Sequence, residues 1–217
     1  DSVWKVTYYR TWTYDAAGRQ LSHIACSKDS VPTIKLFYDY DDEGRIVSNI
    51  SYNYANGGWV GNTLQQYAYD IDGHQVENIL QYGWTNNTWR GGSKDNYQFD
   101  ENGKTVFEAH YTWNNLIEQW TGTYKYLYTY YISGNIETKI AQIYSSNSWV
   151  NNIKEVYDES TANMIEQYSW INMTWQINVA NVYLSGSSSI KMSTNITYTP
   201  SGTIATYEKT TNYYNNE

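Results

Sequence analysis

The chain has few of the residues that usually build a globular core. Its 217 residues include one cysteine, two prolines, three phenylalanines and three methionines. A single cysteine excludes an intramolecular disulfide and a cluster of thiolate metal ligands. Valine, isoleucine, leucine and phenylalanine together number 39, which is too few for an ordinary aliphatic core. No apolar run is long enough for a transmembrane helix.

Basic residues are also scarce, and they are dispersed. Fourteen lysines and arginines stand against 22 aspartates and glutamates, for a net charge of −8, and no basic cluster occurs. Surfaces that bind nucleic acid or anionic lipid need clustered basic charge to displace counterions. We therefore expect no nucleic-acid partner and no insertion into a membrane.

Aromatic residues take the place of the missing aliphatic ones. The chain has 25 tyrosines and 10 tryptophans. Because each ring can bury roughly 150–250 Å², these residues supply enough apolar area for a fold. The sequence predicts an interior that is aromatic rather than aliphatic.

A tryptophan is followed eight residues later by a tyrosine again and again along the chain. An even spacing predicts that both rings lie on one face of a β-strand. The whole unit recurs about every 30 residues, which indicates a repeat array. We expect one domain over residues 1–217, with regular repeats at 4–184 and degenerate hairpins at 185–217. The spaced pairs are Trp59 and Tyr67, Trp89 and Tyr97, Trp120 and Tyr128, Trp149 and Tyr157, and Trp175 and Tyr183.

One kind of turn is an aromatic residue followed by Asp-x-x-Gly. The aspartate can accept hydrogen bonds from the backbone two residues on, and the glycine can adopt positive φ, so each motif predicts a hairpin. Residues 158–162 form a similar motif without the glycine. The complete motifs are 14–18, 40–44, 69–73 and 99–103.

The other kind of turn has an aromatic pair on either side of a short polar loop. A two-residue loop makes the flanking rings direct cross-strand partners, which stabilises the turn and fixes the strand register. Between Trp113 and Trp120 the loop is longer, and we expect residues 114–119 to protrude. The short examples are Tyr54 with Trp59, Trp84 with Trp89, Tyr144 with Trp149, and Trp170 with Trp175.

The segments between turns alternate with period two, and no helical period is sustained. Residues 74–84 and 89–99 are each expected to form one continuous strand. The predicted fold is all-β: an up-and-down antiparallel meander of about seven hairpin repeats and about fifteen strands. We expect a curved, spiral or rolled single sheet that turns its Tyr/Trp face into an interior.

The motifs Tyr-Asp-Ala-Ala-Gly-Arg at 14–19 and Tyr-Asp-Asp-Glu-Gly-Arg at 40–45 resemble the tyrosine-aspartate (YD) repeats of Rhs-type and teneurin-type shells. With the tryptophan turn added, the unit more closely resembles YD-like repeats of secreted or surface proteins of Bacteroidetes, many of unknown function. Later units depart from the motif, because His74, Lys104 and Asn135 replace the arginine. The resemblance implies a hairpin-repeat fold. It also implies export to a bacterial cell surface or periplasm, where a lipid anchor on a removed N-terminal segment is one way of attachment. It implies no catalytic residue.

No enzymatic or metal site is predicted. The three histidines lie in unrelated contexts without a second ligand at metal spacing. Residues 39–44 imitate the start of a calcium loop, but its twelfth position is Ile50 instead of glutamate. Asp70 with Asp72 and Asp100 with Glu101 could pair for glycoside cleavage, although repeated turns explain them more simply. Weak calcium binding stays open, and no cofactor is expected.

The remaining candidates are aromatic and amide side chains, which suit a shallow sugar-binding surface. The first hypothesis is a non-catalytic, extracytoplasmic module that binds glycan or protein at the cell surface. The second hypothesis is a structural shell or spacer fragment of a larger array. An enzyme ranks third. For the first hypothesis the candidate ligand-binding residues are Trp113, Trp120, Asn114, Asn115, Trp84 and Trp89.

Overall fold

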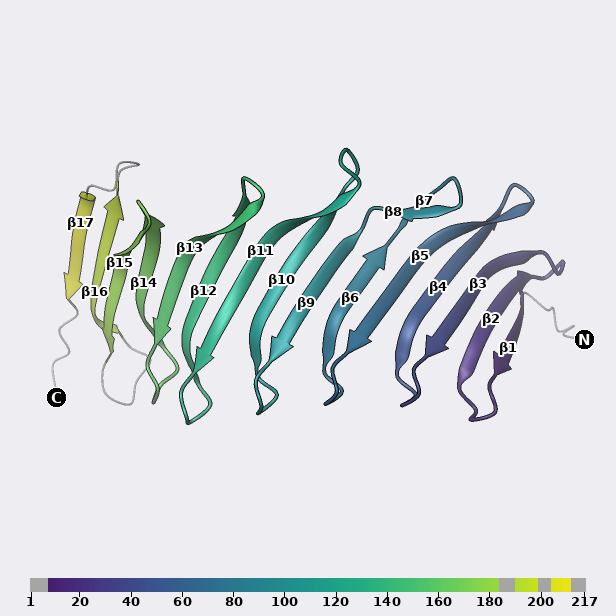
Figure 1. The fold of residues 1–217 in the computed structure, drawn as a ribbon, viewed down its shortest axis with the longest axis horizontal. Helices are drawn as coiled ribbons and strands as arrows, with labels where there is room; N and C mark the ends of the chain where they lie inside the picture. Colours follow the sequence, from purple (N-terminus) through teal and green to yellow (C-terminus); the bar gives the residue numbers. More distant parts are fainter. Residues whose placement is uncertain (1–7, 184–189, 199–203, 212–217) are drawn as a thin grey trace, which may run out of the picture. The chain divides into compact units, whose positions relative to one another are not determined.

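The computed structural model is an all-β chain whose strands follow one another as an antiparallel meander (Figure 1). It describes residues 8–183, 190–198 and 204–211. Fifteen strands form one sheet in sequence order, and β7 and β8 form a separate two-stranded sheet. The predicted all-β meander is therefore confirmed. The strands are β1 (Tyr8–Tyr14), β2 (Gln20–Ser27), β3 (Pro32–Tyr40), β4 (Ile46–Ala55), β5 (Gly58–Tyr69), β6 (Gln75–Gln81), β7 (Gly83–Thr85), β8 (Thr88–Arg90), β9 (Ser93–Phe99), β10 (Thr105–Asn114), β11 (Gln119–Tyr130), β12 (Ile136–Ser145), β13 (Ser148–Tyr157), β14 (Met164–Ile171), β15 (Thr174–Tyr183), β16 (Ile190–Tyr198) and β17 (Ile204–Thr211).

The chain forms two compact units. Unit 1 holds Asp1–Tyr97 with His110–Thr121, and unit 2 holds Gln98–Ala109 with Gly122–Glu217. Within each unit the two kinds of turn lie at opposite ends of the strands (Figure 1). Both units are built from the same kinds of hairpin. That residues 1–217 form one repeat-array domain stays a prediction. The described residues contain no helix that could cross a membrane. Residues 4–7 and 184 of the predicted repeats, and much of 185–217, lie outside the described ranges.

The tryptophan turns have the predicted geometry. Asn56 and Gly57 both have positive φ, 51° and 82°, as a two-residue type I′ turn requires. The flanking Tyr54 and Trp59 are direct cross-strand partners whose ring centroids lie 5.2 Å apart, edge to face. The same pairing occurs in three further hairpins, at Trp84 with Trp89, Tyr144 with Trp149, and Trp170 with Trp175.

The prediction that each tryptophan shares a face with the tyrosine eight residues on is wrong. A β-bulge at Asn62 shifts the register between β4 and β5 by one residue. Since one extra residue reverses the alternation of side chains, Trp59 and Tyr67 project from opposite faces. The bulge lies three residues after the tryptophan of the turn, and the two equivalent bulges are at Asn152 and Asn178.

Two predicted continuous strands are broken in the structure. The segment 74–84 divides into β6 and β7, and the segment 89–99 divides into β8 and β9. Gly91 and Gly92 have φ of 76° and 123° at the second break. A Cβ on Gly92 would overlap the carbonyl oxygen of Leu80, so only glycine lets the backbone pass so close to β6. As a result the β7–β8 hairpin leaves the main sheet.

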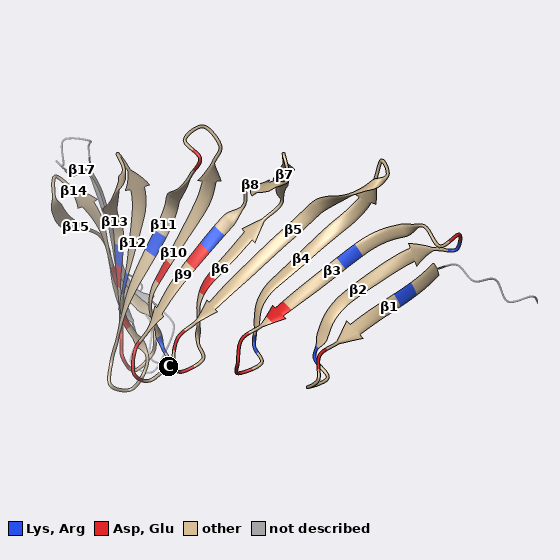
Figure 2. Cartoon of the chain, turned by 45° about the vertical axis from the view of Figure 1, so that its right-hand side comes forward, with Lys and Arg blue, Asp and Glu red and all other residues tan. Residues whose placement is uncertain are grey.

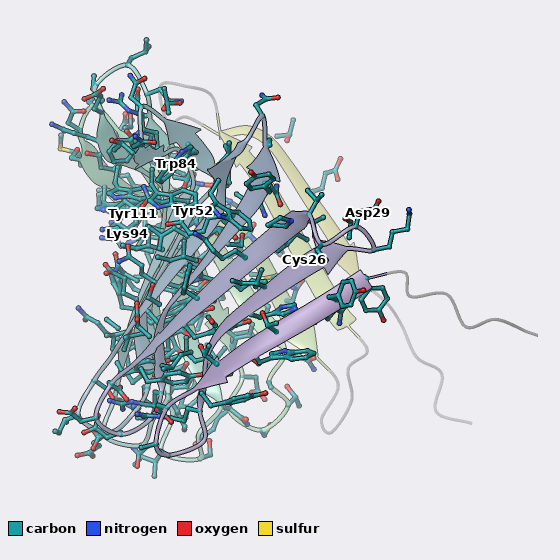
Figure 3. All side chains as sticks on the ribbon, turned by 90° about the vertical axis from the view of Figure 1, so that its right-hand side faces the viewer. Cys26, Asp29, Tyr52, Trp84, Lys94 and Tyr111 are labelled. Atoms are coloured by element: carbon teal, nitrogen blue, oxygen red, sulfur yellow. The ribbon has the colours of Figure 1, made fainter. Side chains whose placement is uncertain are left out.

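This hairpin packs on a glycine of the preceding hairpin. An added Cβ on Gly61 would lie 2.5 Å from Trp84 Cε3 and 2.8 Å from Trp89 Cη2. Trp84 also contacts Tyr52 edge to face, with centroids 5.9 Å apart, and Figure 3 shows the two residues near each other. In unit 2, Gly122 provides the corresponding space for Trp149. The absent side chain is therefore what allows neighbouring repeats to contact each other.

The expected aromatic interior is not found in the described residues. Only two hydrophobic residues there are buried, Leu64 and Ala109, with exposed fractions of 8% and 2%. Trp12 is 47% exposed, and the eight other described tryptophans are half-buried. Side chains project from both faces of the strands (Figure 3). The rings contact neighbouring strands and keep part of their surface in solvent.

Substituting Gly61 tests the contact between repeats. We expect Gly61→Ala to lower the free energy of unfolding by about 1–3 kcal/mol, because the methyl group meets the Trp84 ring. Gly58→Ala is the matched control on the same strand, since a Cβ there has no neighbour within 4 Å. Urea unfolding measures both. Equal effects of the two substitutions would contradict the packing described.

Candidate functional site

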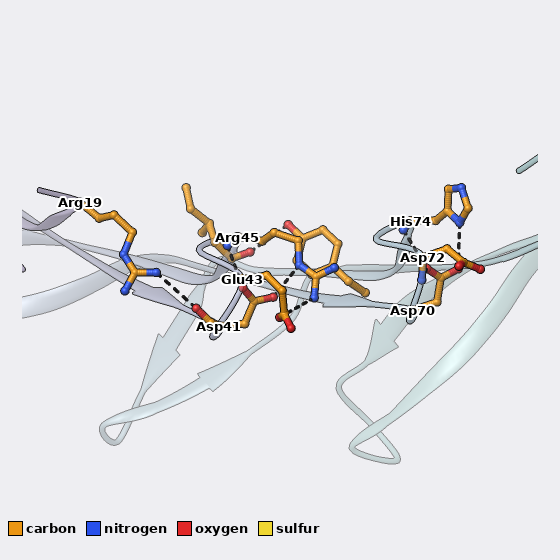
Figure 4. A network of polar contacts seen from close by, with 9 residues as sticks. Arg19, Asp41, Glu43, Arg45, Asp70, Asp72 and His74 are labelled. Atoms are coloured by element: carbon orange, nitrogen blue, oxygen red, sulfur yellow. Dashed lines mark hydrogen bonds and ion pairs between the residues drawn. The ribbon is translucent and has the colours of Figure 1, made fainter. Parts of the chain in front are cut away.

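Each aspartate turn is held by the aspartate itself. Asp15 Oδ1 accepts hydrogen bonds from the backbone N–H groups of Ala17 and Arg19, at 2.9 and 2.8 Å. Its Oδ2 accepts from Arg19 Nε at 2.6 Å. The side-chain hydrogen bond from Arg19, with the backbone bond, holds the pKa of Asp15 below its ordinary value. Asp41 and Arg45 repeat the arrangement, with Nε to Oδ2 at 2.7 Å (Figure 4).

In three of these turns the basic residue also contacts the next repeat. The Arg19 guanidinium lies 4.9 Å from the ring centroid of Tyr40. The Tyr40 hydroxyl donates to the Gln20 carbonyl at 2.8 Å, beside that arginine. A cation over a ring and a tyrosine hydrogen bond therefore join consecutive hairpins. The same joint consists of Arg45, Tyr69 and Ile46 in unit 1, and of Lys104, Tyr130 and Thr105 in unit 2.

The third turn contains a group with the chemistry of a metal site. Ligand atoms of Asp70, Asp72 and His74 all lie within 4.8 Å of one another. Asp70 Oδ1 accepts from the backbone N–H groups of Asp72 and His74, and Oδ2 lies 3.0 Å from His74 Nδ1 (Figure 4). These hydrogen bonds are the ones that the aspartate turn uses elsewhere. The turn therefore accounts for the arrangement of this group without an ion.

The predicted site residues at the longer turn come together in unit 1. The Trp113 and Trp120 rings pack edge to face, with centroids 5.3 Å apart. Asn114 Oδ1 accepts from the backbone N–H of Leu116 at 2.9 Å, so its oxygen supports the loop. Asn115 is exposed, and the loop between β10 and β11 protrudes as predicted (Figure 1).

Two apolar residues at the tip of this loop were not among the predicted site residues. Leu116 is 94% exposed and Ile117 is 56% exposed. Two adjacent aliphatic residues inside a polar loop were the signal that sequence reasoning passed over. They add apolar contact surface beside Asn115.

The second predicted pair, Trp84 and Trp89, is part of the packing between hairpins. Both rings are half-buried over Gly61, with centroids 4.8 Å apart. Arg90 of β8 forms an ion pair with Glu118, which connects this hairpin to the 114–119 loop. The two predicted regions are therefore neighbours at their tips.

A further aromatic cluster lies on the face of β3, β4 and β5 that includes Tyr52, and we call it the Tyr52 face. Lys35 lies directly opposite Tyr52, and Phe37 lies on the same face of β3. The Lys35 ammonium is 4.6 Å from the Trp59 ring centroid, 4.8 Å from that of Tyr52 and 5.2 Å from that of Phe37. The sequence pattern alone does not identify this cluster, because it depends on the register that places Lys35 opposite Tyr52 between β3 and β4.

No family model matches the sequence, and no curated protein matches it. Among solved structures, a protein of unknown function from Bacteroides fragilis aligns with 56% of this chain and 91% of its own, at 17% identity and a TM-score of 0.34. A DUF3836 family protein from Bacteroides vulgatus covers 54% of this chain and 89% of its own, at 15% identity and a TM-score of 0.21.

A chain of the Tc holotoxin pore from Photorhabdus luminescens aligns with 94% of this chain, at 11% identity and a TM-score of 0.26. This chain spans only 14% of the length of that toxin chain. At such identities and TM-scores these likenesses assign no activity. The resemblance to YD-type repeats still rests on the turn motifs.

The joint between repeats can be tested by removing one hydroxyl group. We expect Tyr69→Phe to lower the free energy of unfolding by about 0.5–1.5 kcal/mol, because the Ile46 carbonyl loses its donor. Tyr14→Phe is the matched control, since Tyr14 is 58% exposed and its hydroxyl forms no hydrogen bond within the described part of the chain. If both variants unfold at the same urea concentration, the joint contributes nothing.

The aspartate turns predict that the stability of the fold depends on pH in the acidic range. Because the hydrogen bonds from Arg19 hold the folded pKa of Asp15 below its ordinary value of 3.8, its contribution to stability is present above that pH and is lost as the pH falls through the folded pKa. Between pH 5 and about 2, the wild-type protein should therefore lose more thermal stability than Asp15→Asn, which keeps an acceptor oxygen but cannot titrate. Melting curves that fall in parallel for both proteins would contradict this assignment.

Proposed function

We propose that this chain is a non-catalytic, extracytoplasmic repeat module that binds glycan or protein at a bacterial cell surface. One observation carries the proposal: in the described residues, aromatic rings are half-buried and retain solvent-exposed surface. Rings with partial exposure can both support the fold and offer flat apolar surfaces to a ligand. A sealed aromatic core would have favoured a spacer.

The loop at residues 114–119 is the first contact region in this proposal. It combines the Trp113–Trp120 pair, the exposed amide of Asn115 and the exposed side chains of Leu116 and Ile117. Apolar platforms next to amide groups are what a shallow glycan or protein site requires. The expected export from the cell, which rests on the resemblance to surface repeats, belongs to the same proposal.

A second function has its own support. The joints formed by Arg19 with Tyr40 and by Arg45 with Tyr69 connect hairpins in a way that can continue along an array. Such a chain would serve as a structural spacer or shell segment without a ligand of its own. The two functions predict different outcomes in one binding experiment.

Binding of the full chain to a glycan array and to bacterial envelope fractions tests the proposal. We expect saturable binding that Asn115→Ala weakens about tenfold, the factor that corresponds to about 1.4 kcal/mol. Asn115 is exposed, so its substitution should change stability by less than about 0.5 kcal/mol. Thr112→Ala is the control, because Thr112 is an exposed polar residue of β10, adjacent to Trp113 in the sequence and on the other face of the strand.

Absence of a saturable ligand in both assays would favour the spacer. Binding that survives Asn115→Ala and Trp120→Ala unchanged would move the contact region away from this loop. Trp120→Ala is interpreted only if its far-ultraviolet circular dichroism and urea midpoint remain those of a folded chain.

A further inference from the structure

Lys35 is a cation in the middle of an aromatic surface. Its ammonium lies within 5.2 Å of three ring centroids on the Tyr52 face, those of Trp59, Tyr52 and Phe37. The only acid of β3 is Asp39, four residues along the same strand, or about 13 Å at the rise of a β-strand. Figure 2 shows these two charges as separate bands on β3. The ammonium is therefore surrounded by rings and is remote from the nearest carboxylate of its own strand.

Lys35 forms no ion pair with any residue in the described ranges. Lys94 provides the comparison within unit 1: it lies 4.9 Å from the Tyr111 ring centroid, and its ammonium is also 3.8 Å from Glu77 Oε2. Both lysines stand six residues before the aspartate of a turn, Asp41 or Asp100. The repeat thus supplies a carboxylate near Lys94 and none near Lys35 within the described ranges.

An unpaired ammonium among rings has the chemistry to bind an anion that also has an apolar face. The ammonium has three N–H donors, and contact with rings uses none of them as a conventional hydrogen bond. Phe37 is 38% exposed, and Tyr52 and Trp59 are half-buried, so part of each ring can be reached from solvent. A pyranose ring lays its C–H groups on such surfaces, and a carboxylate on that sugar would pair with the ammonium.

We infer that the Tyr52 face of unit 1 binds an acidic glycan, with Lys35 pairing the carboxylate of a uronic acid residue and the surrounding rings contacting its pyranose face. This inference rests on the proposed binding function and narrows it to one ligand class. The net charge of −8 does not oppose it at short range, because fields from distant acids are screened beyond about 8 Å at physiological ionic strength.

A similar arrangement occurs in unit 2. The Lys125 ammonium lies 5.1 Å from the Trp149 ring centroid and 5.9 Å from that of Phe107, and it has no ion pair with another described residue. Trp149 follows Lys125 by the same number of residues as Trp59 follows Lys35. Burial lowers the pKa of Lys125. Each unit thus carries a lysine in the same sequence relation to a turn tryptophan.

Calorimetric titration of the full chain with oligogalacturonate tests the inference, with the fully methyl-esterified oligomer as the neutral counterpart. We expect the free acid to bind and the ester to bind about tenfold more weakly, because only the free acid can pair with Lys35. Lys35→Gln should weaken binding of the free acid about tenfold, while Lys35→Arg should retain it. Lys28→Gln, which removes the same charge from an exposed turn where Lys28 pairs with Asp29, is the control and should bind as the wild type does.

The outcomes separate this inference from the function on which it rests. If the acid and the ester bind equally, or if Lys35→Gln changes nothing, the inference is wrong and the binding function stands. If neutral glycans on the array bind and oligogalacturonate does not, the inference again fails alone. If no glycan or envelope component binds, both fail. If poly-glutamate competes as effectively as oligogalacturonate, the assignment of an acidic glycan as the ligand is wrong and an acidic peptide is favoured.

Discussion

The contact of aromatic side chains with neighbouring strands and hairpins is the interaction on which the rest of the structure depends. With two buried hydrophobic residues in the described ranges, the chain has almost no conventional core. Apolar burial must then come from rings that pack on neighbouring strands, and the Trp84 and Trp89 rings need space on the preceding hairpin. Gly61 provides that space for Trp84 by having no side chain. Stability is therefore distributed over nearest-neighbour contacts, as in other repeat arrays.

The joints at the aspartate turns also connect neighbouring hairpins through aromatic rings. Where the next repeat offers a tyrosine, as at Tyr40 and Tyr69, the preceding turn supplies an arginine that covers the ring. Where the next repeat offers Phe99, which has no hydroxyl, the preceding turn has His74 instead. Lys104 also replaces the arginine, although Tyr130 follows it, and its ammonium lies over that ring. A turn motif read in isolation does not reveal this pairing.

The local features of this fold could be predicted from the sequence, and the features that depend on register could not. The Asn56-Gly57 turn specifies its own φ angles, so the hairpin and its ring pair were predictable. The face on which each side chain lies was not predictable, because the unpaired residue Asn62 moves every later side chain of the strand to the opposite face. The pairing of Trp113 and Trp120 was predictable for the same local reason. The Lys35 cluster joins two strands, and no local sequence pattern predicts their register.

The dual use of aromatic rings determines how function can be separated from fold in this protein. A ring such as Trp59 contacts both its turn partner and Lys35, so removing it alters packing and any ligand surface together. Polar groups that the sheet does not need are different. The Asn115 amide and the Lys35 charge can be changed while the rings stay in place, because neither forms a hydrogen bond or ion pair with another described residue. Loss of binding at these two positions would therefore report on recognition rather than on folding.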